Sequence, residues 1–174
     1  MRLLYVATLL GAFGIGEASA EDNSERLFQI FEKTCAGKPV SGEALDARAR
    51  GLGYVHQNGP VAPDDGKRNL DDIHSWRLPE EGANFAISAY FAGSRAHYRI
   101  SCGIRADNVD AAAFVAGLMR ETTLPEAQTK SDPETGKLTY SWTADEDGGK
   151  DVLEVAAYKN SRVSVTFTYD VIAR

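Results

Sequence analysis

The strictest pattern in the chain is an alternation of apolar and polar side chains near its C-terminal end. Between residues 163 and 171 the odd positions are apolar and the even positions are polar: Val163, Val165, Phe167, Tyr169 and Val171 against Ser164, Thr166, Thr168 and Asp170. A period of two predicts a strand with one buried face. Because that face must be covered, the pattern requires a sheet that packs against a second layer.

Other segments repeat the same alternation. Residues 85–91 and 98–105 alternate on either side of Gly93-Ser94, which predicts a hairpin. Residues 138–142 and 152–158 predict two more strands ahead of the last one. Strands that follow one another through tight turns pair antiparallel.

Three segments have apolar side chains at helical spacing instead. Residues 24–36, 41–50 and 108–121 are predicted to be helices that cover the apolar face of the sheet. With one more strand around Trp76, the predicted order is ααβββ-α-βββ. Each half of this order is a helical segment followed by a three-strand meander, which is a loose repeat without residue identity between the halves. We therefore predict a two-layer α+β domain with an antiparallel sheet of five to six strands covered by helices.

The N-terminus has the form of a secretory signal peptide. Met1-Arg2 supplies a positive start, residues 3–15 are apolar, and Ala18-Ser19-Ala20 is a small-residue cleavage site. The alternative is a buried N-terminal helix, which the ordered pattern disfavours. We expect residues 1–20 to be removed and residues 21–174 to form a single domain that is periplasmic or secreted. No later stretch is apolar enough to predict a transmembrane anchor.

The two cysteines allow one intramolecular pairing. In an oxidising compartment an even number of cysteines indicates disulfides. The periodicity places Cys35 on the apolar stripe of the first helix and Cys102 on the inward face of a strand. Two buried free thiols or a catalytic thiol are the alternatives, but Cys102 lacks the cationic surroundings of a reactive thiolate. A Cys35–Cys102 disulfide is the favoured interpretation.

Charge and motifs limit the classes of partner. A net charge of −6 with scattered basic residues disfavours nucleic acid, because phosphate binding needs clustered Lys and Arg. His56, His74 and His97 lack the spacing of metal ligands. The segment 71–74 contains two carboxylates and an imidazole, but a solvated cluster is favoured over a metal site. No nucleotide-binding or nucleophile motif occurs, so we predict no cofactor and no catalytic residue.

The polar segment 56–75 is predicted to be a long surface loop. Loops on rigid scaffolds commonly carry recognition residues. We therefore predict a non-catalytic exported protein that binds an envelope protein or a small ligand. An inhibitor is one form that such a protein takes. The sequence indicates no oligomeric state. A small periplasmic enzyme with a site near loop 56–81 is the alternative. The candidate binding residues are Asp71, Asp72, His74, Trp76 and Tyr90.

A last set of residues carries a resemblance. It consists of Phe31 and Cys35, an alanine-rich helix, the pair Gly53-Tyr54, and later Trp76 and Cys102. In the helix the matching positions are Ala44, Ala47 and Ala49. Together these residues resemble small exported proteins of proteobacteria whose function is not established. The resemblance implies a periplasmic location and a disulfide, and it implies no activity or site.

Overall fold

The structure is a computed structural model that describes residues 23–57, 70–77, 85–93, 97–122, 124–146 and 149–172. Within these ranges the side chains of six strand residues are not described: Leu70, Asp71, Asp72, Tyr98, Glu146 and Ile172. The signal peptide expected at residues 1–20 lies outside the described residues.

Two of the described α-helices begin at a side-chain cap, whereas the first has none. α1 (Ser24–Phe31) continues into a π-helical turn, η1 (Glu32–Ala36), and is followed by α2 (Gly42–Gly51) and α3 (Ala111–Glu121). The Ser41 hydroxyl accepts a hydrogen bond from the backbone N–H of Ala44, and the Asp110 carboxylate accepts two at the start of α3. None of these helices is long and apolar enough to cross a membrane.

The described strands form one antiparallel sheet. They are β1 (Val55–His56), β2 (Leu70–Arg77), β3 (Phe85–Gly93), β4 (His97–Ala106), β5 (Gln128–Asp132), β6 (Lys137–Glu146), β7 (Gly149–Ala157) and β8 (Val163–Ile172). Their order across the sheet is β1-β2-β3-β4-β8-β7-β6-β5. The α+β class is therefore confirmed, whereas the predicted count of five to six strands is wrong, because the described residues form eight.

Two strands that the sequence does not predict, β1 and β5, make the observed order of elements differ from the predicted one. β1 has only two residues, and β5 has the sequence QTKSD, which contains no apolar side chain to signal a strand. β2 occupies most of the second half of segment 56–75, so the prediction of a surface loop is wrong for residues 70–75. Each meander thus has four strands rather than three.

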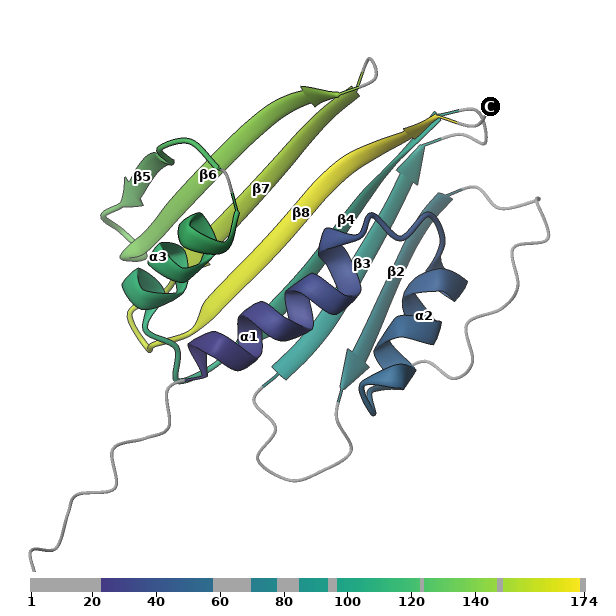
Figure 1. Cartoon of the computed structure of the whole chain (residues 1–174), viewed down its shortest axis with the longest axis horizontal. Helices are drawn as coiled ribbons and strands as arrows, with labels where there is room; N and C mark the ends of the chain where they lie inside the picture. The colour runs from purple at the N-terminus through teal and green to yellow at the C-terminus, as the bar shows by residue number, and fades with distance from the viewer. Residues whose placement is uncertain are drawn as a thin grey trace, which may run out of the picture.

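The two meanders meet at the centre of the sheet. β4, the last strand of the first meander, pairs antiparallel with β8, the last strand of the second, in the register Cys102↔Phe167. Figure 1 shows α1, α2 and α3 on the same side of the sheet. The other side, which we call the open face, is not covered by any described helix.

The core lies between the helices and the sheet. Its fully buried side chains come from both layers and include Leu27, Leu45, Ile87, Ile100, Ile104, Phe114, Leu118, Val155 and Val165. The predicted disulfide is confirmed: Cys35 of η1 and Cys102 of β4 are bonded, and both residues have no exposed surface. The bond holds the helical layer on β4, the last strand of the first meander, at the centre of the sheet.

Candidate functional site

Trp76 faces the helices and not the solvent. Its side chain has no exposed surface, and its indole N–H donates a hydrogen bond to Asp46 Oδ1 of α2 at 2.7 Å. The second carboxylate oxygen of Asp46 accepts from Arg50, also at 2.7 Å. Trp76 therefore fastens α2 to the sheet and is not available as a contact residue in this structure.

His74 is buried beside it. The side chains of His74 and His56 are 6% and 8% exposed, and His56 Nε2 lies 3.0 Å from His74 Nδ1. The ring of His74 stacks on Trp76 and meets the edge of Phe91. Because the two imidazoles contact one another inside an aromatic cluster, they connect β1 to β2 as part of the core. No three potential metal ligands are grouped anywhere in the described part of the chain.

The remaining predicted residues divide into two groups. The backbone of Asp71 and Asp72 lies in β2, but their side chains lie outside the description. Tyr90 is 42% exposed on the open face, and its cross-strand neighbour Ile73 is 66% exposed. Directly paired residues on one face of a sheet lie within contact distance. Ile73 and Tyr90 therefore form an exposed apolar pair, of which the sequence analysis identified only Tyr90.

Small side chains make up the next row of the open face. Ser75, Ser88, Gly103 and Thr166 follow one another across β2, β3, β4 and β8. A Cβ atom at Gly103 would lie 3.0 Å from Thr166 Oγ1 and 3.3 Å from the carbonyl oxygen of Val165. A larger residue there would require Thr166 and the neighbouring strand to shift by a few tenths of an ångström, which favours glycine.

The third row of the open face contains two arginines. Arg77 of β2 and Arg105 of β4 both pair with Ala86 of β3, from opposite sides. Their backbones are two strand spacings apart, which is about 10 Å. Both side chains are exposed, and neither guanidinium has a hydrogen bond or an ion pair with another described residue. On a chain with a net charge of −6, the two arginines place two positive charges in this row of the open face.

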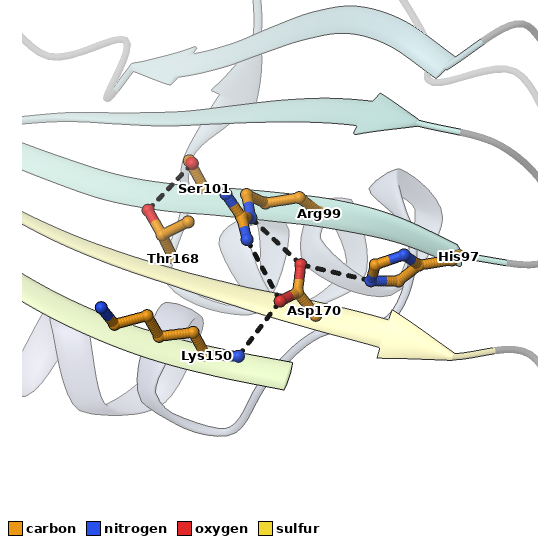
Figure 2. A network of polar contacts seen from close by, with 6 residues as sticks. All are labelled: His97, Arg99, Ser101, Lys150, Thr168 and Asp170. Carbon is orange, nitrogen blue, oxygen red and sulfur yellow. Dashed lines mark hydrogen bonds and ion pairs between the residues drawn. The ribbon is translucent and has the colours of Figure 1, made fainter. Parts of the chain in front are cut away.

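The opposite end of the open face carries a polar network, shown in Figure 2. Arg99 donates two hydrogen bonds to the Asp170 carboxylate, at 3.0 and 3.2 Å, and the backbone N–H of Lys150 donates a third at 3.1 Å. His97 Nε2 lies 3.5 Å from the same carboxylate, whose side chain is only 6% exposed. The hydrogen bonds from Arg99 lower the pKa of Asp170, and the same bonds raise the pKa of Arg99. The network ties β4, β7 and β8 together.

The His97–Asp170 pair does not extend to a nucleophile. The Ser101 hydroxyl bonds to the hydroxyl of Thr168 at 2.9 Å, as Figure 2 shows. Ser101 is four residues from His97 on the same strand, which corresponds to about 13 Å. A catalytic hydroxyl and its base need hydrogen-bond contact, so the described residues of this network form a structural clamp.

The exposed Ile73–Tyr90 pair and the two arginines therefore lie on the open face, on either side of the row of small side chains. Comparison of the chain with protein-family models, with curated proteins and with solved structures found no match.

Proposed function

We propose that the protein is an exported, non-catalytic binding protein that holds an acidic segment of an envelope protein on its open face. The observation that carries the proposal is the pair of exposed guanidiniums of Arg77 and Arg105, which have no partner among the described residues, on a chain with a net charge of −6. Arginine is the side chain best suited to bind carboxylates through paired N–H donors.

The neighbouring rows supply the rest of such a surface. Ser75, Ser88 and Gly103 are small, so a partner segment can approach the sheet closely. Ile73 and Tyr90 add exposed apolar area beyond them, and tyrosine is among the residues that contribute most at protein interfaces. Apolar contact provides affinity and the arginines select an acidic partner.

Export rests on two features of the chain. The signal pattern at residues 1–20 leaves Glu21 as the mature N-terminus, and a disulfide persists in oxidising compartments. Mass spectrometry of protein from its native compartment tests this part of the proposal. A purified species that still begins at Met1 would refute it.

Affinity capture from the native envelope, with the mature protein as bait, tests the binding surface. We expect capture of an acidic partner to be lost in the double variant Arg77→Glu/Arg105→Glu, and to weaken as salt is added. Lys33→Glu/Arg120→Glu is the matched control, because it changes the net charge equally on exposed positions of the helical layer. Equal capture by both double variants would move the binding surface away from the arginines.

The enzyme alternative has less support from the described residues. It placed a site near loop 56–81, where His74 was the candidate imidazole, and His74 is buried against His56. Much of that loop lies outside the described residues. Turnover of an envelope substrate by the purified protein, abolished by one substitution in this loop, would replace the binding proposal.

A further inference from the structure

A pocket lies on the helical side of the sheet, away from the open face. It has a volume of about 280 Å³ and is bordered by η1, the end of α3, the segment that follows α3, and strands β6, β7 and β8. Its walls are mostly apolar and include Phe31, Leu118, Leu124, Trp142, Leu153 and Phe167. Apolar concavities with a small number of polar groups are the usual sites for small ligands.

One carboxylate lines this pocket. Asp151 of β7 has a side chain that is 14% exposed, and its Oδ2 atom lies 2.7 Å from Lys38 Nζ. The ammonium of Lys38 is more exposed, at 38%, and Lys38 is not among the residues that line the pocket. Asp151 Oδ1 has no hydrogen bond with the described residues. An ionised carboxylate only accepts hydrogen bonds, so a ligand must offer it an N–H or O–H group.

Two other features of the wall favour a positive charge. Leu118 and Thr122, from the C-terminal turn of α3 and the residue after it, border the pocket. The C-terminal end of a helix carries a partial negative charge. Trp142, Phe31 and Phe167 also line the pocket, and aromatic rings attract cations that lie over their faces. An anionic ligand would instead meet Asp151, which repels it.

We propose that this pocket binds a compact organic cation with an apolar body. The ammonium group of the ligand bonds to Asp151, and the body lies against Leu153, Trp142 and Leu124. The volume of 280 Å³ corresponds to roughly nine water-sized groups of about 30 Å³ each. Lys38 competes with the ligand for Asp151 and keeps the carboxylate paired when no ligand is bound. This site does not depend on the proposed function of the open face.

Three ligands with the same eight-carbon chain test the head group: octylammonium, octan-1-ol and octanoate. Each is titrated into the mature, oxidised protein and followed by calorimetry and by tryptophan fluorescence. Trp76 is fully buried and is not part of the pocket, so a fluorescence change reports on Trp142. We expect octylammonium to bind at least tenfold more tightly than octanoate. Trp142→Phe should remove the fluorescence change.

Four variants separate the contributions. Asp151→Asn should lower the affinity for octylammonium at least tenfold and leave octan-1-ol unaffected. Lys38→Gln should strengthen octylammonium binding, because the competing ammonium is gone. Ala144→Phe, at an exposed position of the wall, should block all three ligands, whereas Ala112→Phe, exposed on α3 outside the pocket, should block none.

Several results would overturn the proposal. They are the absence of binding by all three ligands, octanoate binding as tight as octylammonium, weaker octylammonium binding in Lys38→Gln, and unchanged binding in Ala144→Phe. Because these measurements use no partner protein, their failure leaves the acidic partner of the open face untouched.

Discussion

Tyr54 illustrates how a single polar group can be buried at a cost. Its side chain is 2% exposed, and its hydroxyl makes no hydrogen bond with the described residues. A buried hydroxyl without a partner opposes folding by about 1–3 kcal/mol. Burial also raises the pKa of Tyr54 to about 12, against which the nearby charge of Arg26 acts weakly.

Tyr54→Phe is therefore expected to leave the free energy of unfolding at pH 7 unchanged or to raise it by about 1 kcal/mol. Because the folded pKa of Tyr54 lies above the unfolded value of 10, the unfolded chain releases this proton first. The free energy of unfolding therefore does not change with the ionisation of Tyr54 below pH 10 and falls as the pH rises toward 12. The variant should lose less stability than the parent in this range. Urea unfolding at pH 7 and pH 11 measures both effects, and a clear loss of stability at pH 7 would show that the hydroxyl is hydrogen-bonded.

Asp170 is the opposite case, because its nearly buried carboxylate accepts three hydrogen bonds. Asp170→Asn keeps the shape but removes the charge that accepts from Arg99 and the Lys150 N–H, so we expect a loss of about 1–3 kcal/mol. Its folded pKa is lowered, so the stabilisation is present above the unfolded value of about 3.9 and is lost as the pH falls through the folded value. Thermal unfolding of both proteins should differ at pH 7 and converge in strong acid. A constant difference would argue against the ionised carboxylate as the source.

At the scale of elements, the side chain of Asp46 links α2 to β2 by a hydrogen bond. Asp46 accepts from the Trp76 indole and from Arg50, each at 2.7 Å. Asp46→Ala should lower the free energy of unfolding by about 1–3 kcal/mol, because the buried indole N–H loses its acceptor. Arg50→Ala is the matched control: Arg50 is 57% exposed, and an exposed ion pair contributes less than about 1 kcal/mol. Equal losses in denaturant titrations would contradict the assigned role of the indole.

The strands differ in how far the sequence predicts them. The alternating strands β3, β4 and β8 were predictable because their pattern is local, and the disulfide because only one pairing exists. The sequence predicts β2 only around Trp76 and assigns residues 70–75 to a loop, because the buried positions of β2 are His74 and Trp76, whose polar atoms bond to residues 18 and 30 positions away. β5 was missed because it contains no apolar side chain and pairs only at the edge of the sheet.

The arginine pair of the open face could not be predicted from the sequence. Arg77 and Arg105 come together only because both pair with Ala86, and this register exists only once three strands are assembled. In the sequence they are two basic residues among many. The alternation along residues 85–91 alone predicts that Tyr90 is exposed. Ile73 could not be predicted in the same way, because the sequence predicts a loop for residues 70–75, where the structure has β2.

At the scale of the whole molecule, the helical layer and the sheet meet at the centre of the fold. Each half consists of a helical segment and a four-strand meander, and the halves join through the β4–β8 ladder. The disulfide ends on β4, so it fixes η1 next to this junction and not at an edge. It also keeps the helical layer over the strands that carry the open face on their other side.

Removal of this bond should affect the stability of the whole fold. Cys35 and Cys102 are 67 residues apart, a separation for which the chain-entropy model gives about 4 kcal/mol. Cys35→Ala/Cys102→Ala should therefore lower the free energy of unfolding by about that amount. Denaturant titration measures it, and parent protein with a reducing agent is the control that keeps both sulfur atoms. A loss well below 1 kcal/mol in both samples would show that the packing of η1 holds the layers together without the bond.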